Sequence, residues 1–287
     1  MNIKNFALPL KILLNEYFIH LIGVRRNSLY PTECYLQKKD KVIKYLNNIN
    51  VNMKLNRDVA TKIHFILDQI IPPILRDSKF FMYLAFRIMY GNKAKIFFNF
   101  KDRALFMTEE EFSRVYADVD KVLIEREIEL NKDCVEKILK NIRGESVLEV
   151  GCGKAWLSNK IEELGYKVTA VDIYINNEIK LRYPKITFKN GNVEHLPFED
   201  NKFDTVVCMH TLEHVQNLTQ SVAELRRVCK KRLIIVVPKQ RPYRYTFDLH
   251  IHFFPYIHSF LLAIGARGKN VYEVIGGDIF YIEDFTA

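Results

Sequence analysis

A glycine turn that directly follows an apolar run constrains this chain more than any other stretch. Residues 147–153 read Val-Leu-Glu-Val-Gly-Cys-Gly, and a helical pattern begins immediately afterwards. Glycine adopts a positive φ without steric cost, and because it lacks a Cβ it lets a ligand approach the backbone. The pattern therefore predicts a strand over residues 146–150, a tight turn at Gly151 and Gly153, and a helix from residue 156.

A second apolar stretch, Lys167–Asp172, predicts a strand that ends in a carboxylate. At this place in an open α/β sheet, a carboxylate accepts hydrogen bonds from both ribose hydroxyls of a nucleoside. The first turn reads Glu-x-Gly-x-Gly and does not continue into GxGxxG, and the segment 191–204 has no counterpart in nicotinamide sites. A doubly wound dehydrogenase is therefore the less favoured alternative.

Strand and helix patterns alternate through the second half of the chain, which predicts a parallel sheet with helices on both faces. The predicted strands are 146–150, 167–172, 185–189, 203–208 and 232–237, and the predicted helices between them are 156–164, 175–182 and 217–230. The pattern then changes. We expect a helix over His252–Ile264 and a hairpin of 271–275 and 279–283 around Gly276–Gly277.

These motifs, in this order and at this spacing, resemble the class I, Rossmann-like methyltransferases that use S-adenosylmethionine (SAM). The resemblance implies an α/β fold, in which a seven-stranded, mostly parallel sheet ends in an antiparallel hairpin and follows a mainly helical region. We expect a helical, basic N-terminal region over 1–105 and a SAM-dependent methyltransferase domain over 106–287. Thr108 and Glu111 form a capping-box pattern at a helix start. By resemblance, helices over 106–141 form a lid on the substrate.

The resemblance also implies how SAM, the expected cofactor, is held. The residues it assigns to the amino-acid end are Glu149, Gly151 and Gly153. It assigns Asp172 to the ribose and Ile173 to the adenine face.

Asn192 departs from the family pattern, which usually has an aspartate at this position. The aspartate accepts a hydrogen bond from the exocyclic amine of adenine, and the side-chain oxygen of Asn192 can accept the same bond. The backbone N–H of Val193 can serve a ring nitrogen. His210, which ends the fourth predicted strand, is also expected beside the cofactor.

A hydroxyl acceptor must lose its proton as it attacks the methyl group, so a base is expected nearby. His210 lies at the carboxyl edge of the predicted sheet, where open α/β folds bind ligands. Asp248, His250 and His252 follow at i, i+2 and i+4, and on an extended segment they share one face. We predict that His250 is the base, that Asp248 orients it, and that His210 is the second candidate. Packing or capping is the alternative role for these histidines.

The same aspartate and histidines suggest a divalent metal as another alternative. Because the sequence identifies no complete ligand set, we predict no metal site. Lys239, Arg241 and Arg244 lie in the loop after the fifth predicted strand and are expected to hold a phosphate or carboxylate of the substrate. A solvated basic loop is the alternative.

The segment after the fourth predicted strand indicates the acceptor class. Nucleic-acid amino-methyltransferases typically carry an Asn/Asp-Pro-Pro-aromatic tetrad there, whereas this chain has Met-His-Thr-Leu at 209–212. The Leu-Pro-Phe and Leu-Glu-His-Val motifs resemble enzymes that act on small molecules, sugars and lipid-linked metabolites. The loop 238–250 resembles bacterial methyltransferases associated with surface-polysaccharide synthesis. We therefore predict transfer to oxygen of a small-molecule, sugar, or lipid- or nucleotide-linked glycan acceptor. A SAM-binding scaffold without turnover and an RNA methyltransferase remain the alternatives.

The charge of the chain is concentrated at its N-terminal end. The formal net charge is +9, and residues 1–107 alone carry 18 Lys and Arg against 7 Asp and Glu. Such a field favours an anionic partner, such as a membrane surface or a phosphorylated substrate, and plain solubility is the alternative. The aromatic run Phe80–Tyr90 is either an interfacial helix or buried core. The five cysteines show no CxxC pair, and we expect neither a secretory signal nor a transmembrane helix. The chain is expected to be cytoplasmic, with peripheral membrane contact through its basic region.

Overall fold

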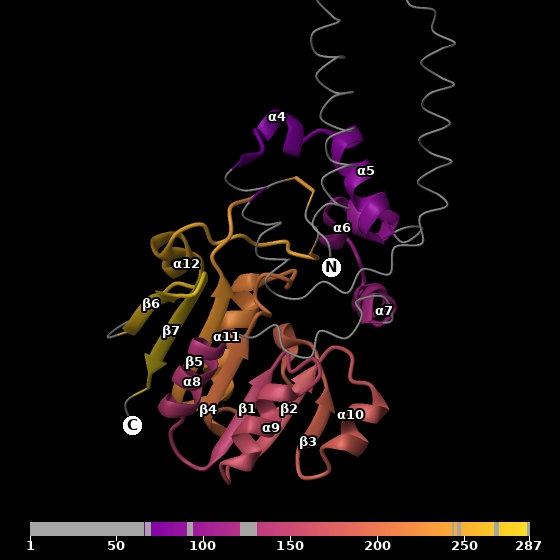
Figure 1. The fold of residues 1–287 in the computed structure, drawn as a ribbon. Helices are drawn as coiled ribbons and strands as arrows, with labels where there is room; N and C mark the ends of the chain where they lie inside the picture. The colour runs from indigo at the N-terminus through magenta and orange to yellow at the C-terminus, as the bar shows by residue number, and fades with distance from the viewer. Residues whose placement is uncertain are drawn as a thin grey trace, which may run out of the picture. The chain divides into compact units, whose positions relative to one another are not determined.

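A computed structural model describes most of the chain from residue 70 onward (Figure 1). The described residues are 66, 70–90, 94–120, 131–242, 244–245, 248–266 and 270–285. They belong to two compact units, one containing residues 73–95 and the other residues 96–285. Most of the expected basic region 1–105 lies outside the described residues.

The first unit contains the aromatic run. Helix α4 spans Pro73–Arg76 and α5 spans Lys79–Tyr90. Phe81, Met82 and Phe86 of α5 are almost completely buried, which favours the buried-core interpretation of this segment. In the part of the chain that the structure describes, no helix is long and apolar enough to cross a bilayer.

The second unit is built on a seven-stranded sheet with the order β3-β2-β1-β4-β5-β7-β6. Only β7 runs antiparallel to its neighbours, so the predicted fold class is confirmed. The inner strands are nearly continuous apolar runs because helices cover both of their faces. The strands are β1 Ser146–Val150, β2 Lys167–Asp172, β3 Thr187–Asn190, β4 Phe203–Met209, β5 Cys229–Pro238, β6 Asn270–Ile275 and β7 Asp278–Asp284.

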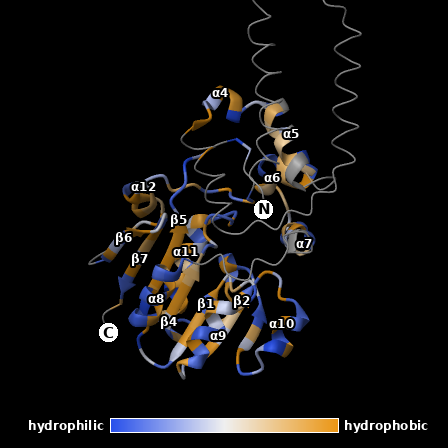
Figure 2. Cartoon of the chain, viewed as in Figure 1, coloured by the Kyte–Doolittle hydropathy of each residue, from blue (hydrophilic) through white to orange (hydrophobic). Residues whose placement is uncertain are grey.

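Two apolar clusters lie on the two faces of this sheet, and side chains of each inner strand alternate between them. On β4, Val206 and Cys208 belong to one cluster, whereas Val207 and Met209 belong to the other. In Figure 2 the central strands are coloured as hydrophobic. The helices α11 (Leu218–Val228) and α12 (Ile257–Ala263) contribute to the first cluster, and α8 (Lys132–Asn141), α9 (Trp156–Glu163) and α10 (Asn177–Arg182) contribute to the second.

The C-terminal hairpin turns at Gly276 and Gly277, whose φ values are 54° and 94°. A two-residue loop with positive φ at both positions matches the twist of the flanking strands. The Asn131 side chain accepts from the Asp133 N–H as the N-cap of α8 and donates to the Ile275 carbonyl oxygen at 2.8 Å. The cap therefore ties α8 to the hairpin.

The helix expected over 252–264 begins only at Ile257. Pro255 explains the delay, because the residue before a proline is disfavoured in helical conformation. The capping box at Thr108 is present: its N–H donates to Glu111 Oε2 at 3.1 Å, and the Glu111 N–H donates to Thr108 Oγ1 at 3.3 Å. None of the four described cysteines forms a disulfide.

Only part of the expected lid over 106–141 lies against the cavity. Helix α7, Glu109–Asp120, contributes Phe112 and Tyr116 to the wall of the main pocket. Helix α8 instead buries Cys134 and Ile138 in the core, because its apolar face packs on the sheet. Residues 121–130 lie outside the described residues.

Candidate active site

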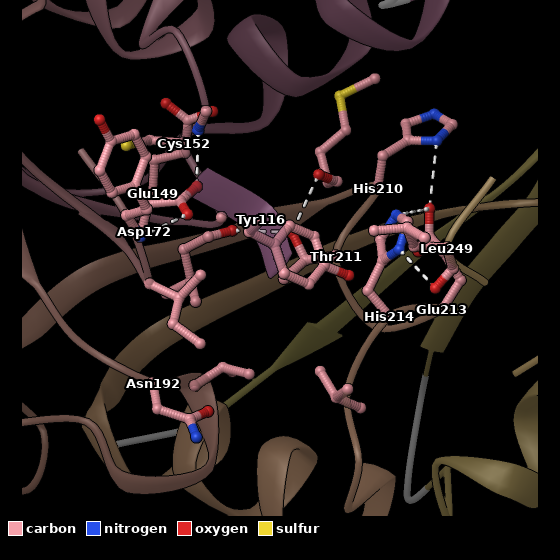
Figure 3. A pocket seen from close by; sticks show the side chains of 18 of the residues that line it. Tyr116, Glu149, Cys152, Asp172, Asn192, His210, Thr211, Glu213, His214 and Leu249 are labelled. Atoms are coloured by element: carbon pink, nitrogen blue, oxygen red, sulfur yellow. Dashed lines mark hydrogen bonds and ion pairs between the residues drawn. The ribbon is translucent and has the colours of Figure 1, made fainter. Parts of the chain in front are cut away.

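A cavity of about 440 Å³ opens at the carboxyl ends of β1, β2 and β4. This is where open α/β sheets bind ligands, and the volume lies in the range of small-molecule sites, roughly 300–1,000 Å³. The turn after β1 and the 3-10 helix η3, Val193–His195, form one side of it. Helix α7 and residues 248–250 also line it. Figure 3 shows Glu149 and Asp172 together at one side of the pocket and Glu213 with His214 at the other.

The glycine turn after β1 has the predicted conformation. Gly151 and Gly153 have φ values of 77° and 49°. The Gly151 N–H donates to the Val171 carbonyl oxygen at 2.8 Å, and the Gly153 N–H donates to Asp172 Oδ2 at 2.8 Å. A Cβ on Gly153 would meet no atom within 4 Å, whereas a Cβ on Gly151 would collide with the Thr211 side chain. Close packing against Thr211 is therefore a reason for glycine at 151 that the sequence did not reveal.

Glu149 ends β1 as a buried carboxyl group, with an exposed fraction of 4%. Its Oε2 accepts a hydrogen bond from Ser158 Oγ of α9. Burial raises the pKa of Glu149 to about 8, and the hydrogen bond from Ser158 only partly offsets this effect. The cofactor-free protein therefore holds a neutral acid here at neutral pH.

Asp172 ends β2 on the same side of the cavity. Besides Gly153, the Tyr174 N–H donates to its carboxylate, at 3.3 Å from Oδ1. Burial raises the pKa of Asp172, although these backbone donors oppose the change. Ile173 also lines the cavity, and its carbonyl oxygen accepts from Ser113 Oγ of α7 at 3.4 Å. The ribose and adenine assignments of these two residues stay predictions.

Asn192 lines the cavity, but its side-chain oxygen caps a helix. Oδ1 accepts from the Glu194 N–H at 3.0 Å, which makes Asn192 the N-cap of η3. The oxygen expected to meet the adenine amine is thus already used by the backbone, because asparagine favours such local turns. Val193 is buried and also lines the cavity. Adenine contacts from both residues stay predictions.

Two further cavity residues, Gln216 and Tyr116, were not foreseen from the sequence. The Gln216 side chain donates from Nε2 to the carbonyl oxygens of Ala104 and Met107, at 2.6 and 3.0 Å. Tyr116 of α7 places a buried hydroxyl in the cavity wall, and this hydroxyl has no hydrogen-bond partner among the described residues. Burial raises the pKa of Tyr116, and the nearby Glu213 and Asp172 carboxylates add to this effect. The capping-box pattern predicts where this helix begins, but it does not indicate which residues of the helix face the cavity.

Four side chains, Glu213, His210, His214 and His250, form a histidine cluster in the cavity, away from Glu149 and Asp172 (Figure 3). Glu213 is fully buried, and neither carboxylate oxygen has a hydrogen-bond partner among the described residues. Its Oε1 lies 3.4 Å from His210 Nδ1 and 3.9 Å from His214 Nε2. Burial opposes ionisation, but the three histidines outweigh it and hold the pKa of Glu213 at about 2. In the sequence, Glu213 stands out only as part of the motif Leu-Glu-His-Val.

His210 lies between two carboxylates that favour its protonated form. It follows β4 with a φ of 51°, and its Nε2 lies 3.5 Å from Asp278 Oδ1 on β7. Burial lowers the pKa of His210, but Asp278 and Glu213 more than compensate and raise it to about 10. These two carboxylates favour the protonated ring, and the role of His210 as a base stays a prediction. Asp278 could not be foreseen because it lies far along the chain.

His214 and His250 both have a defined tautomer. His214 Nδ1 lies 3.1 Å from the Leu249 carbonyl oxygen, and His250 Nδ1 lies 2.6 Å from Gln240 Oε1. A carbonyl oxygen only accepts hydrogen bonds, so each Nδ1–H donates, and the neutral rings carry their lone pair on Nε2. The two rings meet edge to face with centroids 4.7 Å apart.

The predicted shared face of Asp248, His250 and His252 holds only for the first two. Asp248 and His250 line the cavity, whereas His252 Nε2 bonds the Val215 carbonyl oxygen at 2.9 Å and does not line it. The segment is an irregular loop with a bend at Asp248, so side chains do not alternate as in a strand. Gln240 Oε1 lies at His250 Nδ1, and the orienting role of Asp248 stays a prediction.

The three basic residues predicted to bind substrate lie apart from the cavity wall. Lys239, Arg241 and Arg244 are exposed and are not among the residues that line it. The Arg244 guanidinium lies over the ring of Tyr245, 5.4 Å from its centroid. Their role in substrate binding stays a prediction.

Comparison with known proteins shows that part of this chain is similar to methyltransferases. Residues 148–237 match the family described as a methyltransferase domain. An uncharacterised protein of Methanocaldococcus jannaschii is 31% identical over 52% of this chain, and a probable S-adenosylmethionine-dependent methyltransferase of Mycolicibacterium smegmatis is 29% identical over 39%. A ubiquinone biosynthesis O-methyltransferase of Rickettsia conorii is 29% identical over 36%. These alignments span 55%, 44% and 37% of the relatives' own lengths.

The geometry of the cavity agrees with this match. SAM carries an ammonium group, a ribose and a sulfonium, and the cavity presents the Glu149 carboxyl, the Asp172 carboxylate and an open backbone at Gly153. Glu149 and Asp172 lie at the carboxyl ends of the neighbouring parallel strands β1 and β2, and open α/β sheets bind nucleosides at this edge. Residues 148–237, which match a methyltransferase domain, thus lie within the seven-stranded, Rossmann-like sheet that the sequence predicted.

Proposed function

We propose that the protein transfers a methyl group from SAM to an oxygen atom of a small-molecule, sugar, or lipid- or nucleotide-linked glycan acceptor. One observation carries the proposal: the histidine cluster lines the same cavity as the glycine turn and Asp172. Groups that handle an acceptor proton are thus placed in the pocket that suits the cofactor. The Rickettsia relative, which is named as an O-methyltransferase, supports oxygen as the acceptor atom.

SAM supplies a methyl group that is activated by its sulfonium charge. The residues of this chain bind, orient and accept a proton. Glu149 and Asp172 hold the amino-acid and ribose ends, and the backbone of Gly153 closes around them. His250 accepts the acceptor's proton at Nε2, since its Nδ1–H is committed to Gln240. A positioned base of this kind typically contributes about 10²- to 10⁴-fold to the rate.

The finer substrate class rests on the sequence. The loop 238–250 resembles that of bacterial methyltransferases associated with surface polysaccharides, and its exposed Lys239, Arg241 and Arg244 suit a phosphate or carboxylate on the acceptor. The basic N-terminal segment adds attraction for an anionic substrate or a membrane surface. An acceptor that carries a nucleotide or a lipid phosphate would meet both requirements.

The proposal is tested by supplying radiolabelled SAM together with candidate acceptors: phenols, nucleotide sugars, lipid-linked sugars and RNA. We expect label in an alkali-stable ether on a non-nucleic-acid acceptor. His250→Ala should abolish transfer while SAM affinity stays unchanged, and His258→Ala, at an exposed histidine outside the cavity, should have no effect. SAM binding without transfer to any acceptor would instead indicate a scaffold, and label in RNA would indicate an RNA methyltransferase.

A further inference from the structure

We propose that Glu213, His214 and His250 form a binding site for a divalent transition-metal cation. One ligand atom from each of the three residues lies within 4.8 Å of the other two. Two imidazoles and one carboxylate are a common ligand set for Zn²⁺ and Fe²⁺ sites that keep further coordination positions open. All three residues line the cavity, so the open positions would face the acceptor.

The spacing of the ligand atoms suits a metal ion after a small inward movement. Glu213 Oε1 and His214 Nε2 are 3.9 Å apart. Ligands at about 2.0–2.2 Å from Zn²⁺ lie roughly 3.3 Å from one another in tetrahedral geometry. All three ligand atoms lie within 4.8 Å of one another, so the side chains have to move inward to bind an ion.

The Glu213 carboxylate is the observation that calls for a partner. Its oxygens are buried and have no hydrogen-bond partner among the described residues. A buried carboxylate normally either is hydrogen-bonded or coordinates a metal, because its desolvation is otherwise uncompensated. Its closest described neighbour, His210 Nδ1, stands at 3.4 Å, which is an ion-pair distance.

The backbone brings the three ligands together from two separate segments. The N–H groups of Ile251 and His252 donate to the Glu213 carbonyl oxygen at 2.7 and 3.0 Å. These bonds attach the loop that carries His250 directly to the turn that carries Glu213 and His214. The ligand positions are therefore set by the fold before any ion binds, which reduces the cost of ordering them.

Both histidines are oriented as metal ligands usually are. A metal-bound histidine almost always donates its other ring N–H to a carboxylate or carbonyl oxygen, which fixes the tautomer. His214 donates from Nδ1 to Leu249, and His250 donates from Nδ1 to Gln240. In both rings Nε2 is then the nitrogen that would coordinate a cation.

The cation site goes beyond the proposed methyl transfer, since the cation binds the protein alone. The two are linked at His250, because one Nε2 cannot hold a proton and a metal ion together. With an ion held by these residues, its positive charge would lower the pKa of an acceptor hydroxyl, and the proton would pass to solvent instead of to His250. The competing explanation is an ion pair of Glu213 with His210, which requires no metal ion.

The test measures metal binding to the full chain after treatment with a chelator. Isothermal titration with Zn²⁺ and Mn²⁺ gives affinity and stoichiometry, and the visible spectrum of the Co²⁺-loaded protein reports the coordination geometry. We expect one ion per chain, with binding weakened at least about tenfold in His250→Ala and in His214→Gln. His258→Ala should bind like the wild type. A second marker is Gln240→Leu, which removes only the orienting acceptor and should weaken binding by about 10- to 100-fold.

Two results would overturn the proposal: no stoichiometric binding to the wild type, or binding that His250→Ala and His214→Gln leave unchanged. The second result would place the ion on other histidines or cysteines of the chain. Circular dichroism of each variant shows whether it is folded, and SAM titration of the same samples shows whether the cofactor side is intact. Failure of the cation site is thereby distinguishable from loss of the fold or of cofactor binding, and transfer of label from SAM by the same samples tests the proposed function separately.

Discussion

Replacing Glu149 by glutamine should reduce the pH dependence of the protein's stability. Burial raises the pKa of Glu149 from 4.5 to about 8 in the folded protein. Between these two values the folded state binds more protons than the unfolded state, so stability decreases as the pH rises. The stabilising effect of the protonated group is complete below the unfolded pKa and is lost as the pH passes the folded pKa.

The size of the effect follows from the same shift. If the folded state binds one proton more than the unfolded state, the free energy of unfolding falls by up to about 1.4 kcal/mol per pH unit. Over the whole pKa shift of Glu149 the change amounts to roughly 5 kcal/mol. Glutamine keeps a polar group beside Ser158 but has no ionisable proton. We therefore expect the unfolding free energy of Glu149→Gln, relative to that of the wild type, to rise steadily from pH 5 to pH 8. Above pH 8 this difference should stay constant.

Urea unfolding of cofactor-free protein at unit intervals from pH 5 to pH 9 measures this difference. Trp156 is the only tryptophan of the chain and starts α9 beside the glycine turn, so its fluorescence reports on the domain that contains Glu149. Glu199→Gln, at an exposed position, serves as the control and should follow the wild type at every pH. A stability difference between Glu149→Gln and the wild type that is the same at pH 5 and pH 8 would refute the reasoning.

Three further predictions concern the cofactor side and the basic segment. Asp172→Ala should weaken SAM binding by about 1.5–3 kcal/mol, because a charge-assisted contact to ribose is lost; wild-type affinity by calorimetry would exclude the ribose assignment. Gly151→Ala should lower the melting temperature more than Gly153→Ala, because only the first places a Cβ against Thr211; equal melting temperatures would contradict this. Liposomes with anionic lipids should sediment the full chain at low salt and release it at high salt, whereas no binding at low salt would rule out a membrane role for residues 1–107.

The sheet could be predicted from sequence because its signals are local. The apolar runs at 146–150 and 167–172 coincide with β1 and β2, and Gly276–Gly277 marks the hairpin turn. Errors occurred where one residue overrides a periodic pattern. Pro255 delayed the helix expected from His252.

The histidine cluster could be predicted only in part, because some contacts of its side chains join residues that are far apart in the sequence. His210 was correctly placed at the edge of the sheet, but its ionisation depends on Asp278, which is 68 positions further along the chain. His250 was chosen for its spacing from Asp248, whereas Gln240 is the partner of its Nδ1. The contact between His210 and Asp278 depends on β4 and β7 both lying beside β5, which the local sequence does not show.

Glu213 is a buried charged residue that local sequence patterns do not predict. In the motif Leu-Glu-His-Val it resembles a polar helix position, yet the chain forms a turn there that directs the side chain into the interior. Removing a carboxylate from water costs several kcal/mol, and an apolar residue of similar size would avoid that cost. The fold therefore carries a charge that its own stability does not require. Sites that break a local rule in this way are expected where function demands them, and the cavity wall beside His214 and His250 is such a place.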